Sequence, residues 1–459
     1  MRKKRNLILF LAALAAPAAA QSPSDPELYD RALAAGYKAQ FLCSGLWNGG
    51  RTRDEVERDE LTGIYDRIAA AVPALPAEID KASRQVRVGF AETMPPRTAQ
   101  WRAGLGCVSL PIGAPAESAG RLPRLSDAEA DLGALDRRPW PMGDEGAEAP
   151  QPRPAELERV AGSALDGAAF GGRTSAVLVL RNGRIVAERY GLGHDRHTSQ
   201  RTWSVAKSLA GTLIGHGVQR GIIRTDEAAD LTAWRSPGDP RAAITVDQLI
   251  RMASGLTSDT AGNRTDDLYM GGTAVADRSP RWPLLHPPGS HYRYANNDTL
   301  LATMALMERL PETERLGFPL GFFRRLGMTR TIAETDWQGN FILSSQVWTT
   351  ARDLARLGLL YLQDGVWQGE RLLPEGWREY VTRASGPQPE GDFGYGATFW
   401  LMNRSEGVPP DSFAAFGNRG QYLVIVPSRD LVIVRRGYDS SQDRFDVAAF
   451  TRAVVAALD

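Results

Sequence analysis

Residues 174–191 read TSAVLVLRNGRIVAERYG, and this stretch decides the fold. Two apolar runs flank Asn182-Gly183, and an Asn-Gly pair between such runs is the strongest short signal for a β-hairpin. Near the C-terminus, residues 421–437 read QYLVIVPSRDLVIVRRG, with a turn predicted at residues 427–430. Because both hairpins are apolar, we expect them to share one antiparallel sheet.

Helical patterns surround the two hairpins. Residues 155–168 and residues 444–458 are expected to form helices that pack against a face of the sheet. Residues 219–385 are mainly helical in pattern and would form an insertion between the two sheet halves. The predicted fold is α+β: an antiparallel β-sheet flanked by helices, with an inserted, mainly helical subdomain and an N-terminal extension. Further helices are expected at residues 204–218, 244–256 and 349–365, and a further strand at residues 395–401.

The first twenty residues have the features of a secretory signal peptide. A basic start, Arg2 to Arg5, precedes the apolar run NLILFLAALAAPAAA, and the small residues ending at Ala20 suit cleavage before Gln21. The apolar run is too short to favour a membrane anchor, and no later segment reaches transmembrane length. We therefore expect an exported protein, periplasmic or secreted, without stable membrane insertion after cleavage.

Three units are predicted after the signal peptide. Residues 21–120 form an N-terminal extension, in which residues 59–72 have helical spacing and residues 84–91 alternate like a strand. Residues 121–157 are rich in Pro, Ala, Asp, Glu and Gly, so we interpret them as a linker or a loop that follows the surface. Residues 158–459 form the main domain.

The two cysteines of the mature chain, Cys43 and Cys107, are candidate disulfide partners in an oxidising compartment. Such a bond would stabilise the fold by about 4 kcal/mol on the chain-entropy model. Two buried thiols are the alternative. Neither cysteine is surrounded by a catalytic signature.

Composition narrows the class of partner. The formal net charge is zero, so no basic excess suggests a nucleic acid and no acidic excess suggests a polycation. No phosphate loop or dinucleotide fingerprint appears, and no cofactor is predicted. The composition therefore favours a small substrate or a neutral polymer over a charged polymer as the partner.

The stretch RTWSVAKSLAG, residues 201–211, holds the main candidate for chemistry. Lys207 is the only lysine after residue 81, whereas the other cations of that stretch are arginines. If Ser204 starts a helix, Lys207 lies one turn later on the same side, within reach of the serine hydroxyl. A serine needs a base to become a nucleophile, and a buried lysine can lose its proton whereas an arginine does not. Codon bias would explain the scarcity of lysine but not this placement.

A second element, HYRYANND at residues 291–298, supplies Tyr294 and Asn296. A tyrosine beside a lysine ammonium can carry a proton to a leaving group. Asn296 could hold the lysine or a substrate amide by hydrogen bonds. Alone, this Tyr-x-Asn pattern would equally suit a packed loop tyrosine.

Together these motifs resemble the serine β-lactamase and penicillin-recognising superfamily, and within it the class C β-lactamases, esterases and aminohexanoate-dimer hydrolases. The resemblance covers residues from about 155 to 459 and includes ITVDQLIRMASGL, TTARDLARLGLLYLQDGVWQGERLLP and FGNRGQYLVIVPSRDLVIV. It implies an acyl-enzyme mechanism in which Ser204 is the nucleophile, Lys207 the base and Tyr294 the proton shuttle. Tyr269, in DDLYMGG, is similar to the tyrosine that contacts a scissile amide in the aminohexanoate branch.

The third superfamily motif departs from its usual form. Ala415-Phe416-Gly417 stands where the superfamily has Lys or His, Thr or Ser, and Gly, so no lysine remains to bind a substrate carboxylate. Arg419 is the candidate replacement. Backbone N–H groups of Asn418 and Ser204 could form an oxyanion hole, with Gly417 allowing close approach.

The histidine pair His194 and His197 has possible metal-ligand spacing, but a metal site needs a third ligand, and the sequence offers few histidines. No metal site is predicted. The expected function is a serine hydrolase acting on an ester or amide. A β-lactamase or D,D-peptidase is the first alternative, and a non-catalytic sensor domain of the same fold is the second.

Overall fold

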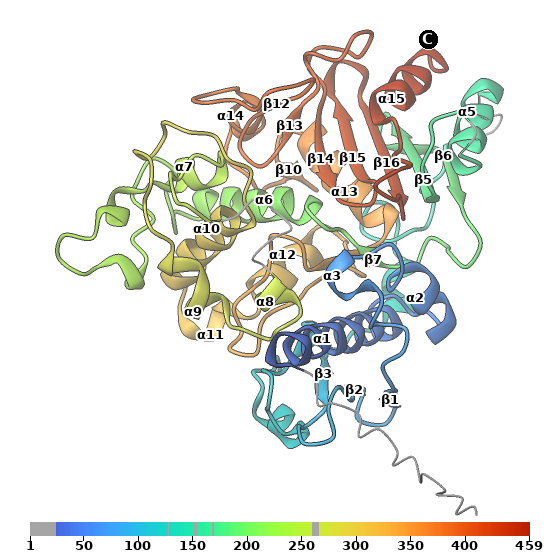
Figure 1. The fold of residues 1–459 in the computed structure, drawn as a ribbon. Helices are drawn as coiled ribbons and strands as arrows, with labels where there is room; N and C mark the ends of the chain where they lie inside the picture. The colour runs from blue at the N-terminus through green and yellow to red at the C-terminus, as the bar shows by residue number, and fades with distance from the viewer. Residues whose placement is uncertain (1–23, 127, 150–153, 168, 259–265) are drawn as a thin grey trace, which may run out of the picture.

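The computed structural model describes residues 24–126, 128–149, 154–167, 169–258 and 266–459 (Figure 1). The predicted signal peptide lies outside the described residues. A large antiparallel sheet forms the upper part of the molecule in Figure 1, with strand order β12-β13-β14-β15-β16-β5-β6. Within the described residues, no helix combines the length and apolar character that crossing a membrane requires.

The two predicted hairpins form the middle and one edge of this sheet. The first hairpin is β5 (Thr174–Arg181) and β6 (Arg184–Tyr190), which turn at Asn182-Gly183. The second is β15 (Gln421–Val426) and β16 (Leu431–Gly437). Strand β16 pairs antiparallel with β5, so the predicted shared sheet is confirmed. The other strands are β14 (Phe413–Gly417), β13 (Trp400–Leu401) and β12 (Gly394–Tyr395).

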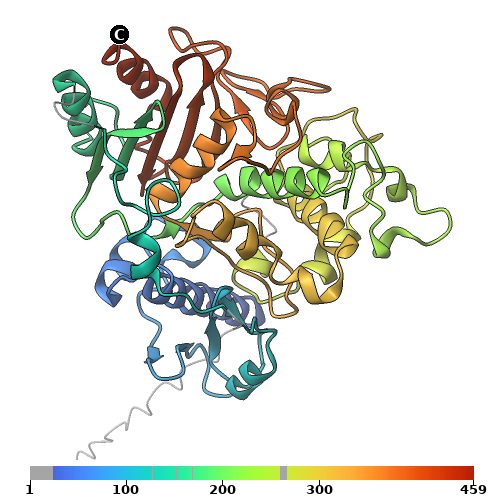
Figure 2. The same ribbon diagram turned by 180° about the vertical axis from the view of Figure 1, so that it is seen from behind.

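Helices cover both faces of the sheet, as predicted. Helices α5 (Ala155–Leu165) and α15 (Val447–Ala456) share an apolar cluster with one face. On the other face α13 (Ala351–Leu362) packs against β5, β15 and β16, and α6 (Val205–Gln219) packs against β14 and β15 (Figure 2). This arrangement places the start of α6 beside the end of β14.

The inserted region between the sheet halves is mainly helical. Its longest helix, α10 (Asn296–Arg309), packs against both α6 and α7 (Val246–Ile250). Short strands β7 (Gln200–Arg201), β9 (Val347–Thr349) and β8 (Ile332–Ala333) form a separate sheet next to α6. The remaining helices include α8 (Asp266–Tyr269), α9 (Val275–Arg278), α11 (Glu312–Arg315), α12 (Phe318–Arg325) and α14 (Trp377–Thr382).

The N-terminal extension folds as one long helix on a small sheet. Helix α1 (Asp25–Trp47) lies against β2, β3 and β4 (Figure 1). Two short helices follow it, α2 (Arg53–Asp59) and α3 (Asp66–Ala69). The antiparallel strands are β1 (Ala77–Asp80), β2 (Gln85–Val88), β3 (Arg97–Arg102) and β4 (Gly106–Ser109).

The extension and the main domain share a continuous apolar core. Leu33 and Phe41 of α1 belong to the same buried cluster as Leu209 of α6. A Cβ at Gly36 would lie 2.0 Å from the carbonyl oxygen of Met270, so only a glycine lets α1 approach the main domain this closely.

Glu334 ties the two units together with polar contacts. Its carboxylate is 1% exposed and accepts hydrogen bonds from four groups of the extension. The donors are Ser44 Oγ at 2.6 Å, Asn48 Nδ2 at 2.8 Å, Cys107 N at 3.0 Å and Gln40 Nε2 at 3.1 Å. Burial raises the pKa of Glu334 to about 7, although these hydrogen bonds oppose the rise.

Three predicted elements differ from the structure. The helix predicted at residues 59–72 covers only α3, because α2 ends at Asp59 and Gly63 takes a left-handed φ of +62° that prevents a continuous helix. The strand predicted at residues 395–401 is interrupted: Thr398 has a φ of +64°, and the chain turns between β12 and β13. The helix predicted at residues 244–256 covers only α7, since Met252 and Gly255 also have positive φ.

The structure joins Cys43 of α1 to Cys107 of β4, closing a loop with a sequence separation of 64 residues. We expect the double variant Cys43→Ser/Cys107→Ser to lose about 4 kcal/mol of unfolding free energy, because the open chain gains conformational entropy when it unfolds. Urea unfolding of both proteins under non-reducing conditions measures this loss. Wild type unfolded in the presence of reductant is the second comparison. If the double variant and the reduced wild type both kept the urea midpoint of the oxidised wild type, the expectation would be contradicted.

Candidate active site

Ser204 is the N-cap residue of α6, and only Thr202 and Trp203 separate it from the short strand β7. The residue before it, Trp203, has a left-handed φ of +50°, and this sharp turn brings the chain from strand to helix. Ser204 is partly exposed, whereas the residues on either side of it are buried. The hydroxyl is therefore presented from a rigid, otherwise buried turn.

Lys207 lies one helical turn after Ser204, as the spacing predicts. Its Nζ donates to Ser204 Oγ at 3.1 Å, to Asn296 Oδ1 at 2.6 Å and to the carbonyl oxygen of Ser344 at 2.9 Å. The side chain is 1% exposed, and burial lowers the pKa of Lys207 to about 7. A lysine with this pKa is partly neutral at neutral pH and can accept a proton.

Tyr294 lies close to Lys207, just before α10. The Lys207 Nζ is 5.0 Å from the centre of the Tyr294 ring. Burial raises the pKa of Tyr294 to about 12, while hydrogen bonding with Ser204 and with Trp400 opposes the rise. The phenol therefore stays protonated at neutral pH, next to the serine hydroxyl.

Asn296 and Tyr269 complete a buried polar chain behind the lysine. Asn296, the first residue of α10, is 4% exposed and accepts from Lys207. The hydroxyl of Tyr269 is 2.8 Å from Ser344 Oγ. Tyr269 is 3% exposed, so in this structure its ring supports Ser344 from behind rather than lining an open surface.

Ser344 was not among the residues predicted from the sequence. Its carbonyl oxygen fixes Lys207, and its hydroxyl contacts Tyr269. The residue lies in the loop before β9, and no local motif marks it. Only the folded arrangement of that loop over α6 shows its role.

The end of β14 lies against the start of α6. A Cβ at Gly417 would be 2.3 Å from the carbonyl oxygen of Thr202 and 3.3 Å from the backbone nitrogen of Ser204. Glycine at this position therefore lets the end of β14 reach Ser204. Asn418 follows Gly417 directly and is exposed, and it remains the predicted second oxyanion donor beside the Ser204 nitrogen.

Arg419 does not take the predicted place. The residue is 7% exposed, and its guanidinium donates from Nη1 to the carbonyl oxygen of Asp59 at 2.8 Å and lies 5.3 Å from the centre of the Tyr438 ring. The interpretation of Arg419 as an open binding group for a substrate carboxylate is wrong, because the N-terminal extension already holds its side chain.

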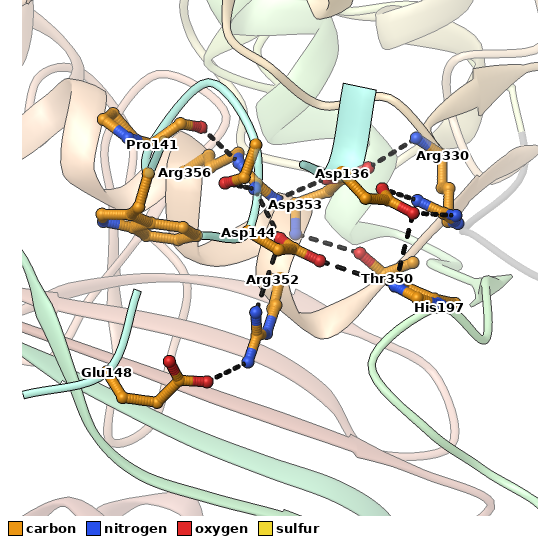
Figure 3. A network of polar contacts seen from close by, with 12 residues as sticks. Asp136, Pro141, Asp144, Glu148, His197, Arg330, Thr350, Arg352, Asp353 and Arg356 are labelled. Atoms are coloured by element: carbon orange, nitrogen blue, oxygen red, sulfur yellow. Dashed lines mark hydrogen bonds and ion pairs between the residues drawn. The ribbon is translucent and has the colours of Figure 1, made fainter. Parts of the chain in front are cut away.

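The two histidines, His194 and His197, have different surroundings. His194 Nε2 is 3.3 Å from the Tyr438 hydroxyl, whereas His197 joins Asp136 and Asp144 in a group of possible metal ligands. Arginines already neutralise both carboxylates: Arg330 pairs with Asp136, and Arg352 and Arg356 pair with Asp144 (Figure 3). Arg352 also pairs with Glu148 and Glu188, and Arg356 with Asp353, so the carboxylates of this network are already paired with arginines. We interpret it as the contact that fastens residues 132–149 to the main domain.

Comparison with known proteins adds independent information. The Beta-lactamase family model matches residues 166–436. A 6-aminohexanoate-dimer hydrolase from Paenarthrobacter ureafaciens is 29% identical over 292 residues, which span 57% of this chain and 72% of that protein.

Two solved structures have the same fold. A proposed 6-aminohexanoate-dimer hydrolase from Bacillus anthracis is 20% identical, with a TM-score of 0.54 over 74% of this chain and 87% of that one. A penicillin-binding protein from Bacillus halodurans is 15% identical, with a TM-score of 0.51 over 65% of this chain and 100% of that one. The predicted fold class is confirmed, and the family model begins after the N-terminal extension has ended.

Proposed function

The chain belongs to the Beta-lactamase family, and from this premise we propose that it is an exported serine hydrolase. In this proposal it cleaves an ester or amide bond of a small substrate through an acyl-enzyme intermediate. One observation carries the proposal: the buried amine of Lys207 lies 3.1 Å from the hydroxyl of Ser204. A sensor domain would gain nothing from burying a deprotonatable amine beside a serine, since this burial costs free energy.

Acylation follows from this geometry. Lys207 Nζ accepts the proton of Ser204 as Oγ attacks the substrate carbonyl carbon, and the carbonyl oxygen becomes an oxyanion. The backbone N–H groups of Ser204 and Asn418 donate to that oxyanion, and such donors each lower the barrier by about 3 kcal/mol. The carbon–oxygen or carbon–nitrogen bond then breaks, and the leaving group departs with a proton.

Tyr294 supplies that proton. Its phenol is protonated at neutral pH and lies beside both Ser204 and Lys207, so it can give its proton to the leaving group and regain one from the lysine. A water molecule then attacks the acyl-enzyme, and the same groups return the proton to Ser204. The raised pKa of Tyr294 makes Lys207, rather than a tyrosinate, the base in this scheme.

The substrate is proposed to lack a carboxylate next to the scissile bond. The third motif has no lysine, and the guanidinium of Arg419 is already hydrogen-bonded to the carbonyl oxygen of Asp59 in the extension. These two observations disfavour a β-lactamase or D,D-peptidase, each of which must hold such a carboxylate. The relative named for hydrolysis of an aminohexanoate dimer supports an amide as one substrate class.

A hydrolysis screen combined with active-site labelling tests the proposal. The purified protein is offered p-nitrophenyl esters, small anilides, linear amide dimers and a chromogenic cephalosporin. In parallel it is incubated with a fluorophosphonate, digested, and analysed by mass spectrometry. We expect ester or amide turnover and one adduct, on the peptide that contains Ser204. An adduct on another serine, or no reaction with any substrate or probe, would refute the proposal.

The pH profile is a separate prediction. Protonated Lys207 cannot accept a proton, so kcat/KM is expected to rise about tenfold per pH unit below the pKa of about 7 and to level above it. The Tyr294 phenol, with its pKa of about 12, gives no falling limb below pH 9. Initial rates on an uncharged ester between pH 5 and 9 measure the profile. Recovery of full activity after incubation at each pH excludes unfolding, and a flat profile would contradict Lys207 as the base.

A further inference from the structure

The N-terminal extension approaches the candidate oxyanion site, although it lies outside the family-model match. Helix α2 ends at Asp59, and the carbonyl oxygen of Asp59 accepts from Arg419 Nη1 at 2.8 Å. Arg419 directly follows Asn418, whose N–H is the proposed oxyanion donor. One hydrogen bond therefore links the extension to the loop that carries this donor.

Arg419 keeps an unfavourable backbone conformation at this point. Its φ is +57°, in the left-handed region, which costs a residue with a Cβ about 1 kcal/mol or more. The next residue, Gly420, also has a positive φ, of +76°, and a Cβ there would lie 1.8 Å from Arg435 Nη1. A glycine at position 419 would adopt this φ without strain. The contacts of the arginine side chain must offset the cost.

The sheet holds the same loop from the opposite side. The carbonyl oxygen of Arg419 accepts from Gln421 Nε2 at 3.1 Å and from the backbone nitrogen of Asp439 at 3.2 Å. Gln421 is 1% exposed and is itself held by Arg436 Nε at 2.7 Å. The backbone of Arg419 is thus fixed by the sheet, and its side chain by the extension.

Asp59 is a firm anchor for this contact. It is 1% exposed, and its carboxylate pairs with Arg51, with Arg58 at 2.8 Å and with Arg173 of the main domain at 2.9 Å. Arg51 in turn donates to the Tyr438 hydroxyl at 2.9 Å. Contacts at Arg51 and at Asp59 therefore fix the α2 segment to the main domain.

We propose that Arg419 is a positioning residue through which the N-terminal extension holds the oxyanion donor of Asn418 against Ser204. The inference rests on the proposed function. Arg419 does not touch the substrate; it limits the motion of residues 417–420, so that the Asn418 N–H stays aimed at the carbonyl oxygen during attack. The extension is then a working part of the catalytic site, as well as a support for the core.

Three variants test this role. Arg419→Gly removes the side chain but keeps a residue that favours the left-handed backbone. Arg419→Lys keeps a cation that can still reach the Asp59 carbonyl. Arg84→Gly is the matched control, because Arg84 is also an arginine with a left-handed φ, of +53°, but stacks on Trp101 in the extension. Each variant is compared with wild type for kcat, KM, thermal midpoint and hydrogen–deuterium exchange of the peptide covering residues 416–423.

We expect Arg419→Gly to lower kcat about thirtyfold with KM changed less than threefold, since a displaced oxyanion donor affects the transition state more than binding. Hydrogen–deuterium exchange of residues 417–420 should be faster in Arg419→Gly than in wild type. Arg419→Lys should recover most of the turnover, and Arg84→Gly should match wild type. Unchanged exchange or unchanged kcat in Arg419→Gly, with wild type active, overturns the inference. If wild type itself neither turns over nor labels at Ser204, the proposed function fails instead, and the exchange result still reports whether Arg419 holds the loop.

Discussion

Ser204→Ala is expected to lower kcat/KM by about 10⁵-fold on any substrate that the wild type cleaves. The variant removes the atom that forms the acyl-enzyme, and the oxyanion donors and binding contacts alone leave only a small residual rate. The change is small in volume and occurs at a partly exposed position, so the fold should persist. Steady-state rates and intact-protein mass after fluorophosphonate treatment measure both consequences.

The matched control for this variant is Ser208→Ala. Ser208 lies one turn further along α6 and is 1% exposed, and its Oγ donates to the carbonyl oxygen of Thr398 at 2.6 Å. Losing that hydrogen bond should cost about 1 kcal/mol of stability and leave turnover within about fivefold of wild type. If Ser204→Ala kept more than one hundredth of wild-type activity, Ser204 could not be the nucleophile.

Lys207→Arg is expected to be almost as inactive, with kcat/KM lowered about 10⁴-fold. Arginine preserves the positive charge but does not release its proton in proteins, so it cannot serve as the base. The larger guanidinium must also fit where Lys207 now contacts Asn296 and Ser344, and crowding there should lower the thermal midpoint. Pre-steady-state acylation with a chromogenic ester separates loss of the base from slow deacylation.

The chain offers a control in Lys38, another buried lysine. Lys38 is 2% exposed, its Nζ donates to the carbonyl oxygens of Pro73 and Leu75, and burial also lowers its pKa. Lys38→Arg therefore tests the cost of placing a guanidinium in a buried lysine site of the extension. We expect it to lower stability while acylation stays within about threefold of wild type. Comparable acylation rates for the two variants would contradict a special role for position 207.

The central sheet and the contact between Ser204 and Lys207 could be predicted from the sequence because local patterns specify them. Asn182-Gly183 fixes the first hairpin, and the three-residue spacing fixes Lys207 beside Ser204 once a helix begins there. Only the direction of the Lys207 pKa shift could be anticipated, because the shift is caused by burial under residues that are far away in the sequence.

Other parts of the site depend on contacts that no local pattern encodes. Ser344 reaches Lys207 through the path of a loop, and Arg419 turns toward Asp59 because α2 ends there. The sequence suggests a carboxylate-binding role for Arg419 only while the extension is ignored. The longest helix, α1, does carry a readable signal, since Ser24 and Glu27 form a capping box before a run of good helix formers.

The docking of α1 has a consequence for how the chain folds. Glu334 draws its hydrogen-bond donors from residues up to 294 positions earlier, and Gly36 meets the carbonyl of Met270. Contacts between such distant residues raise the contact order and slow folding, because a very long loop must close before they form. A nascent chain that emerges N-terminus first must keep the apolar side of α1 uncovered until most of the polypeptide has followed. We therefore expect refolding of the whole chain to be slow and prone to aggregation at high protein concentration.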